Sequence, residues 1–437
     1  GDRDRDRERE REDRMRRSVC VRVCTAALLL VVLLCGGVAV ADSLFVGLGK
    51  PRDAAASVPS PVRPLQGAVV EPIILIPGLS GSALEAKLDH VQGLPHFFCT
   101  HTKDWHKVWV VETELLPFVR DCFVHDMFLH FDEKTRTFHN TEGVSVRPED
   151  FGNVTAVSYL ATQETGYMVQ MIDYFKQKGG YVVGENLFAA PYDWRYDTKS
   201  MMTNSMFADL KALVELAYAR SGGVRVNLIG HSMGGPVGQT FLADFVDQTW
   251  KDTYISNFFS FAGPFGGAPF AVPVLLQSKI LGNLNISPEV NDMVARLASV
   301  LEMLPMTGVL GKDYELVRVG DRNFTLGQLG DLLELSGHPD MKPLLEYAFD
   351  TYPRSNPPGV HTHCMFGYGI PTLNVVVYKD YNLATAPVDI IEVDGDSTVT
   401  TNSLESCQDW IPLQTQPVDV VRYFNVSHDG MVYSQDV

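Results

Sequence analysis

The residues best suited to do chemistry surround Ser232. Residues 224–235 read Val-Arg-Val-Asn-Leu-Ile-Gly-His-Ser-Met-Gly-Gly, so an apolar run leads into Gly-x-Ser-x-Gly. This is the strand–turn–helix pattern of a nucleophile elbow, in which a serine on a strained turn is exposed to attack an acyl carbon. A glycine-rich turn in an unrelated α/β protein is the alternative. The helical spacing of apolar residues over 236–246 favours the elbow.

Two later residues are the predicted partners of this serine. A serine hydroxyl becomes nucleophilic when a base takes its proton and a third group orients that base, and α/β-hydrolases place these groups in the order serine, acid, histidine. Asp396, presented by a turn after an apolar strand, is the predicted acid, with Asp394 as the alternative, and His428 is the predicted base. The alternative for the acid is a solvated Asx turn or a calcium-like acidic loop. The alternative for the base is an ordinary surface histidine. His231 is expected to pack or form hydrogen bonds.

Acyl transfer also needs donors for the oxyanion that develops on the attacked carbonyl. Two backbone N–H groups are expected to supply them. One belongs to Met233, the residue after the nucleophile. The other is assigned to Leu79, because Pro77-Gly78-Leu79 closes an early apolar strand and so lies at the same edge of the sheet.

Strands and helices alternate along the chain, which predicts an α/β fold with a mostly parallel sheet covered on both faces. Expected strands are 69–76, 181–187, 224–229, 258–262, 374–378 and 389–393; expected helices are 165–178, 207–219 and 236–246. Residues 265–362 lose this rhythm. We expect them to form a cap inserted into a core of residues 69–264 and 363–437, with an ordinary helical subdomain as the alternative.

Residues 90–135 are rich in aromatic side chains and are expected to form a disulfide-closed lid or membrane-binding loop, with Trp105 and Trp109 contacting lipid or substrate. Packing as a satellite core is the alternative. The four cysteines after residue 41 are predicted to form two disulfides. Three pairings are possible; we expect the sequential one, Cys99–Cys122 and Cys364–Cys407.

The N-terminal segments predict a secretory route. Residues 1–14 alternate acidic residues with arginine and are expected to be disordered. Residues 15–41 have the basic, apolar and small-residue regions of a signal peptide, with a signal anchor as the alternative, and residues 42–68 form a linker. A start of translation at Met15 would leave residues 1–14 upstream of the protein. Four glycosylation sequons agree with this route: Asn153, Asn285, Asn323 and Asn425.

Charge excludes other classes of partner. The formal net charge is −17, and loss of nine arginines and seven acidic residues with residues 1–41 would make it −19. Such a chain gains nothing from nucleic acid or from anionic lipid, so contact with a membrane has to come from apolar side chains. The sequence predicts no phosphate-binding loop, no metal site and no cofactor.

Several stretches resemble the lecithin:cholesterol acyltransferase family, which includes lysosomal phospholipase A2 and the phospholipid:diacylglycerol acyltransferases. They are residues 71–89, 190–195, 230–235, 394–399 and 428–434, within a resemblance that covers residues 69–437. The resemblance implies an α/β-hydrolase that moves an acyl chain from a phosphatidylcholine-like lipid, through Ser232, to water, a sterol or another lipid alcohol. It also implies the disulfide pairing above, a membrane-binding loop at 99–122 containing Trp109, and a membrane or lipoprotein surface as partner.

Two other functions remain open at this point. A neutral lipase or esterase would use the same residues on a different lipid, and an inactive lipid-binding protein could have the same fold. The presence of Ser232, Asp396 and His428 in the expected order argues against the inactive protein. The expected location is outside the cell or in the lumen of a secretory or lysosome-like organelle.

Overall fold

The computed structural model describes residues 70–109, 111, 116, 119–160, 166–278, 287–352, 356–434 and 437. The predicted charged run, signal peptide and linker lie outside the described residues, as does the sequon at Asn285. In the part of the chain that is described, no single helix is long and apolar enough to cross a membrane. The pair Pro288–Ala295 and Ala298–Leu310, bent by 57°, meets the length and composition criteria only when the two are joined.

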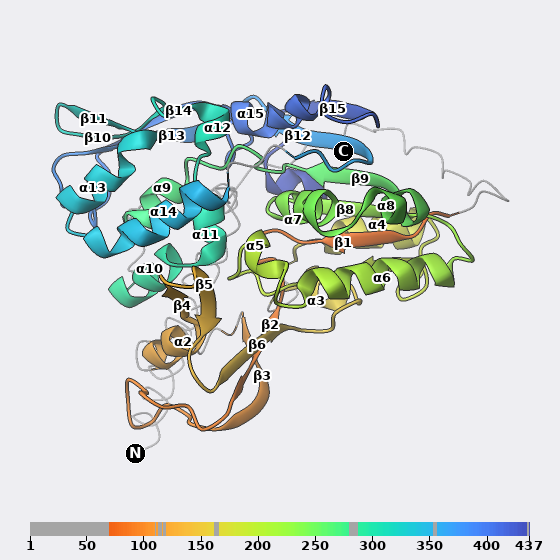
Figure 1. The fold of residues 1–437 in the computed structure, drawn as a ribbon, viewed down its shortest axis with the longest axis horizontal. Coiled ribbons are helices and arrows are strands. Elements are labelled where there is room, and N and C mark those ends of the chain that lie inside the picture. The colour runs from red at the N-terminus through yellow and green to blue at the C-terminus, as the bar shows by residue number, and fades with distance from the viewer. Residues whose placement is uncertain are drawn as a thin grey trace, which may run out of the picture.

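A six-stranded sheet in the order β15-β12-β9-β8-β1-β7 forms the core, and its neighbouring strands are paired in parallel. The strands are β1 (Ile73–Ile76), β7 (Leu187–Ala189), β8 (Val226–His231), β9 (Ile255–Phe261), β12 (His361–Tyr368) and β15 (Val418–Phe424). The fold class predicted from strand–helix alternation is therefore confirmed. Figure 1 shows this sheet with helices packed along it and the cap beside it.

Side chains of the central strands alternate between two cores. Ile74 and Ile76 join one core with apolar residues of α6 and α7, whereas Ile73 and Leu75 join a second core with residues of α4. This alternation follows from the two-residue repeat of a strand and explains why helices are needed on both faces. The helices around the sheet are α3 (Thr155–Ser158), α4 (Val169–Lys178), α5 (Thr198–Met201), α6 (Met206–Arg220), α7 (Gly234–Thr240) and α8 (Gln248–Tyr254).

Residues 265–362, which were predicted to form the cap, share a second sheet with residues 370–395, and we use the name cap for both segments together. Its strands run in the order β11-β10-β13-β14. They are β10 (Glu315–Val319), β11 (Arg322–Thr325), β13 (Ile370–Tyr378) and β14 (Asp389–Gly395), and the cap helices are α9 (Ala271–Leu275), α10 (Pro288–Ala295), α11 (Ala298–Glu302), α12 (Thr307–Leu310), α13 (Leu329–Leu335) and α14 (Lys342–Thr351). The cap helices and this sheet gather on the left of Figure 1.

Three strand predictions are corrected. Segments 374–378 and 389–393 were expected to be the last core strands, but they lie in the cap sheet as β13 and β14. Most of β14 is exposed, whereas a core parallel strand is buried on both faces. The segment 181–187 forms a turn and an isolated bridge before the three-residue β7. Strand β12 was not predicted.

The segment between β1 and α3 forms a smaller layer below the core in Figure 1. Its three-stranded sheet has the order β3-β2-β6, and a separate hairpin pairs β4 with β5. The elements are β2 (Leu84–Leu88), β3 (Lys103–Trp109), α2 (Arg120–Met127), β4 (Leu129–Asp132), β5 (Thr137–Asn140) and β6 (Val144–Pro148). Cys99–Cys122 ties the loop before β3 to α2, and Cys364–Cys407 ties β12 to the 3-10 helix at Glu405–Trp410, so both predicted disulfides are confirmed.

A buried arginine joins this layer to the core. Arg195 is completely buried, and its guanidinium donates to both carboxylate oxygens of Asp193 at 2.9 and 2.6 Å. The same group donates to the carbonyl oxygen of Met127 at 3.1 Å and to Oδ1 of Asn140 at 2.7 Å. One side chain therefore connects the core with α2 and β5.

Replacing Arg195 by alanine is expected to lower the free energy of unfolding by about 3–5 kcal/mol, because Asp193 would keep a largely buried charge without its partner. Urea denaturation measures this loss. Arg136→Ala is the matched control, since its ion pair with Asp350 is solvent-exposed and such pairs contribute less than about 1 kcal/mol. Equal small losses in both variants would contradict the proposed anchoring by Arg195.

Buried polar contacts also hold the cap to the core. Asp197, just before α5, accepts hydrogen bonds from the hydroxyls of Tyr347 and Tyr352, the first at 2.5 Å. The backbone N–H of Thr198 donates to Glu302 at 2.8 Å. Because these polar groups are buried, breaking the contacts would leave them unsatisfied, so they fix α11 and α14 against the core.

Candidate active site

Ser232 lies on a sharp turn between β8 and α7. Its φ of 55° is the left-handed conformation that side chains rarely adopt, and its backbone N–H donates to the carbonyl oxygen of Phe261 at 2.8 Å. Gly230 and Gly234 make the turn possible. A Cβ at Gly230 would lie 2.3 Å from the carbonyl oxygen of Gly234, and one at Gly234 would lie 2.2 Å from that of Ile76. The predicted elbow geometry is thus present.

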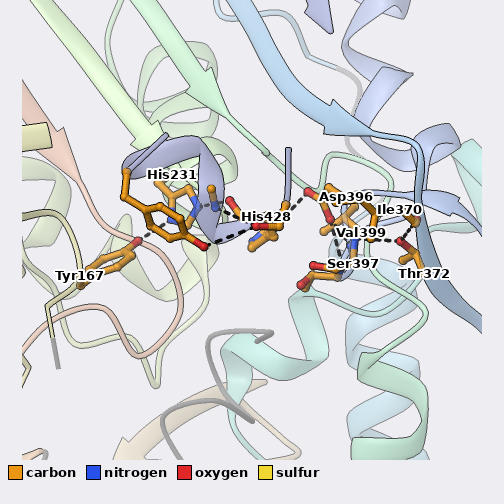
Figure 2. Close-up of polar contacts among 12 residues, drawn as sticks. Tyr167, His231, Ile370, Thr372, Asp396, Ser397, Val399 and His428 are labelled. Carbon is orange, nitrogen blue, oxygen red and sulfur yellow. Dashed lines mark hydrogen bonds and ion pairs between the residues drawn. The ribbon is translucent and has the colours of Figure 1, made fainter. Parts of the chain in front are cut away.

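An aspartate and a histidine meet in the core beyond this turn. Nδ1 of His428 lies 2.8 Å from Oδ2 of Asp396, and both side chains are almost fully buried. The other carboxylate oxygen, Oδ1, accepts the N–H groups of Thr398 at 3.0 Å and Val399 at 2.7 Å. The N–H of His428 donates to the carbonyl oxygen of Asp396 at 2.7 Å. Backbone and side-chain contacts together fix the orientation of the imidazole (Figure 2).

The alternative acid lies elsewhere. Asp394 is exposed, and its two carboxylate oxygens accept hydrogen bonds from the N–H of Gly369 at 2.8 Å and from the hydroxyl of Thr401 at 2.6 Å. These contacts connect β14 to its neighbours. The geometry therefore favours Asp396 over Asp394 as the partner of His428.

His231 links the turn to His428. Its ring centroid lies 5.1 Å from that of His428, and its Nε2 lies 3.1 Å from the carbonyl oxygen of His428. On the other side, Nδ1 of His231 lies 2.6 Å from the hydroxyl of Tyr167. Burial, with a smaller contribution from the neighbouring His428, lowers the pKa of His231 to about 3. The ring is therefore neutral, with Nε2–H as donor and Nδ1 as acceptor.

The loop predicted to supply an oxyanion donor lies against the elbow. A Cβ at Gly78 would lie 2.9 Å from Cβ of Ser232, so only glycine allows this approach. The N–H of Gly78 donates to the hydroxyl of Tyr167 at 2.9 Å. Leu79 follows in this loop, and Met233 directly precedes α7. The structure thus brings both predicted donor residues next to Ser232, and their role stays a prediction.

Tyr167 was missed as a site residue, because an aromatic residue before an apolar helix predicts only packing. Its hydroxyl accepts from the N–H of Gly78 and donates to Nδ1 of His231, so it connects the predicted oxyanion loop to the residue before Ser232. Figure 2 shows Tyr167 and His428 on opposite sides of His231. We assign Tyr167 a positioning role.

Tyr167→Phe is expected to lower kcat by about 5- to 150-fold with little change in KM, because two buried groups would lose a hydrogen bond at a cost of roughly 1–3 kcal/mol. Steady-state kinetics on an ester substrate measures kcat and KM separately. Tyr174→Phe, an exposed tyrosine of α4, is the matched control. An equal fall in both variants, or a rise in KM alone, would contradict the positioning role.

The burial of Trp109 contradicts its predicted role, whereas that of Trp105 stays a prediction. Trp109 was expected to contact lipid, but it is only 2% exposed, donates to the carbonyl oxygen of Ser80 at 2.9 Å and packs on Trp194. It supports the segment after the oxyanion loop and is unavailable to a membrane. Trp105 is partly exposed beneath the guanidinium of Arg147.

Other aromatic residues of the same predicted segment face solvent. Phe97 is 96% exposed and Phe98 is 48% exposed, and both directly precede Cys99, the first cysteine of the Cys99–Cys122 disulfide. Of the described sequons, Asn323 and Asn425 are exposed and Asn153 is half-buried.

A parallel sheet, a strained serine turn and a buried Asp–His pair at the same edge define the α/β-hydrolase class. The chain matches the family model described as lecithin:cholesterol acyltransferase over residues 105–332 and 346–435. It therefore belongs to the lecithin:cholesterol acyltransferase family and is an enzyme of the acyltransferase and phospholipase type.

Individual relatives agree with this assignment. The phosphatidylcholine-sterol acyltransferase of Gallus gallus is 30% identical over 370 residues, which cover 83% of this chain and 87% of the relative. The lysosomal phospholipase A and acyltransferase of Rattus norvegicus is 30% identical over 370 residues, with the same coverage of 83% and 87%. Among solved structures, the Tle4-Tli4 complex contains a chain with a TM-score of 0.46 and 12% identity, covering 83% of this chain and 95% of that one.

Proposed function

We propose that this protein removes a fatty acyl chain from a phosphatidylcholine-like phospholipid and passes it, as an ester of Ser232, to water or to a sterol or other lipid alcohol. The observation that carries the proposal is the buried Asp396–His428 pair beside the strained turn of Ser232. The names of the relatives, a phosphatidylcholine-sterol acyltransferase and a lysosomal phospholipase A and acyltransferase, support a phospholipid donor.

In the first half of the reaction, Oγ of Ser232 attacks the ester carbonyl carbon while Nε2 of His428 takes the hydroxyl proton. Asp396 accepts the Nδ1–H of His428 and stabilises the imidazolium that forms. The N–H groups of Leu79 and Met233 are proposed to stabilise the oxyanion. Cleavage of the ester C–O bond releases the lysophospholipid alcohol, which receives the proton from His428.

In the second half, a hydroxyl group attacks the acyl-Ser232 ester. His428 takes the proton of that hydroxyl and returns a proton to Oγ of Ser232 as the ester bond breaks. Water gives a free fatty acid, whereas a sterol or glycerol hydroxyl gives a new ester. Both outcomes use the same three residues, so access of the acceptor decides between them.

We propose that Phe97 and Phe98, which directly precede the Cys99–Cys122 loop, bring the protein to a lipid surface. Both aromatic side chains are exposed, and the chain has a formal net charge of −17, so attraction to anionic lipid would not drive binding. Burial of such side chains is a sufficient alternative driving force.

Phe97→Ser/Phe98→Ser is expected to weaken binding to phosphatidylcholine vesicles by about 10- to 100-fold, from the loss of roughly 1.5–3 kcal/mol of apolar burial. Vesicle co-sedimentation measures it. Ile411→Ser/Leu413→Ser removes two side chains that are each 55% exposed elsewhere and should leave binding unchanged. Equal binding by the two double variants would contradict the assignment.

One incubation tests the proposed reaction. Purified protein is given vesicles of acyl-labelled phosphatidylcholine with cholesterol, and free acid, cholesteryl ester and lysophospholipid are measured over time. Stoichiometric release of lysophospholipid with free acid or ester is expected. Activity on labelled triacylglycerol but not phosphatidylcholine would identify a neutral lipase, and binding without release of either product would identify an inactive lipid-binding protein.

We further propose that the chain enters the secretory pathway through residues 15–41 and acts outside the cell or in an organelle lumen. The two disulfides support an oxidising compartment. The exposed sequons at Asn323 and Asn425 are accessible to glycan transfer. Expression in cultured cells, with glycosidase treatment and N-terminal sequencing of the product, tests both statements.

A further inference from the structure

Two histidines and an aspartate meet near the amino-terminal ends of strands β12 and β15, opposite the strand ends that carry the predicted catalytic residues. His361 and His363 are two residues apart on β12, so their side chains lie on one face, and Asp419 lies opposite His363 on β15. One ligand atom from each residue lies within 4.8 Å of the others. Of the described residues, these three form the only such group.

The distances allow a shared ion. Nε2 of His361 lies 2.7 Å and Nδ1 of His363 lies 3.2 Å from Oδ2 of Asp419. Ligand atoms about 2.0–2.2 Å from a tetrahedral ion are roughly 3.3–3.6 Å apart. Small outward rotations of the exposed Asp419 and the half-buried His361 therefore make room for an ion.

A chain of amides assigns the protonation of His363. The acceptor-only carboxylate of Glu71 lies 2.9 Å from Nδ2 of Asn227, so Oδ1 of Asn227 faces Nδ2 of Asn257 at 2.9 Å. Oδ1 of Asn257 then faces Nε2 of His363 at 3.4 Å. This arrangement favours the tautomer of His363 that donates Nε2–H to Asn257, and in that tautomer the lone pair of Nδ1 is directed at Asp419.

A lone pair that faces a carboxylate oxygen is repelled unless a proton or a metal ion lies between them. Metal-binding histidines commonly donate their second ring N–H to an acceptor, which fixes the orientation of the ring. Asn257 provides such an acceptor for His363. Sequence spacing alone missed this arrangement because Asp419 comes from another strand.

We propose that His361, His363 and Asp419 bind a Zn²⁺ ion that joins the edge strand β15 to β12. Two imidazole nitrogens and one carboxylate oxygen suit Zn²⁺, whereas Ca²⁺ and Mg²⁺ prefer oxygen ligands alone. The fourth position faces solvent on the exposed side of Asp419 and takes water. About 17 Å of strand separates Asp419 from the end of β15, and His428 comes after that end. The proposed ion is therefore distant from the catalytic site and has a structural role.

Isothermal titration of chelator-treated full-length protein with ZnCl₂ tests the proposal, with Co²⁺ absorption in the visible range as a second readout. One ion per chain is expected, together with a higher melting temperature and the absorption of a low-coordinate Co²⁺ site. Asn257→Ala is expected to weaken binding by roughly 10- to 100-fold.

Four further variants separate this site from others. His361→Gln/His363→Gln and, separately, the exposed Asp419→Asn are expected to abolish or strongly weaken binding while acyl release persists. His130→Gln/His139→Gln, which removes the stacked histidine pair of β4 and β5, and His428→Ala are expected to bind one ion as before. Absence of stoichiometric binding by the wild type, binding that survives in both site variants, or loss of binding in His428→Ala would overturn the proposal.

Discussion

Ser232→Ala is expected to reduce acyl release by roughly a millionfold, to the limit of detection, while the protein remains folded. The variant loses the only atom that can form the acyl ester, and removal of such a nucleophile costs about this much in serine hydrolases. Release of labelled fatty acid from phosphatidylcholine measures the loss, and circular dichroism with thermal unfolding verifies the fold.

Ser260→Ala is the matched control for this experiment. Ser260 is a buried serine on β9, close to the elbow, and its hydroxyl has no hydrogen-bond partner among the described residues. The variant should retain nearly full activity. Turnover by Ser232→Ala above a small fraction of the wild-type rate would contradict the proposed acyl ester.

Asp396→Asn is expected to lower kcat by about ten thousandfold with little change in the fold. An amide at this position can donate to Nδ1 of His428 and so stabilise the wrong tautomer, which leaves Nε2 unable to accept the serine proton. The control is Asp394→Asn, whose contacts with Gly369 and Thr401 lie outside the pair. Its rate should change by no more than a few-fold, and inactivation of Asp394→Asn alone would show that the acid is misassigned.

Asp396→Asn is also expected to change the pH dependence of kcat/KM. Burial lowers the pKa of His428, but the charge and hydrogen bond of Asp396, with a smaller contribution from Asp429, outweigh it, so the pKa lies above the ordinary value of 6.5. Only the neutral imidazole accepts a proton, so kcat/KM should fall as the pH drops through this raised pKa. The residual activity of Asp396→Asn should show this fall at lower pH. If kcat/KM fell at the same pH in Asp396→Asn as in the wild type, a group other than His428 would be responsible for the fall.

The local parts of the site were predictable from sequence. The glycines at 230 and 234 are required because backbone carbonyls occupy the space that a side chain would need. The Gly-x-Ser-x-Gly pattern of five residues therefore predicts the turn. The acid and base could be chosen by chain order, and the structure brings Asp396 and His428 together. The sequential disulfide pairing was one of three open to the four cysteines, and the family resemblance implied it.

Contacts between distant segments were not predictable in the same way. The hydroxyl of Tyr167 reaches a histidine 64 residues later, and nothing in its neighbourhood distinguishes it from a packing residue. Trp109 and Phe97 belong to the same predicted aromatic segment, residues 90–135, yet one is buried and the other exposed. Strands β13 and β14 have apolar runs like those of core strands, and only their partner β10 assigns them to the cap.

That assignment of β14 constrains how the enzyme can move. Asp396 directly follows a strand of the cap sheet, whereas His428 follows β15 of the core. A cap that swung away on a hinge would pull the acid from its histidine and break the buried contacts of Asp197 and Glu302. Assembly of the Asp396–His428 pair therefore requires the cap to be docked on the core, so a loss of cap docking would remove the acid from the site as well as expose the buried contacts.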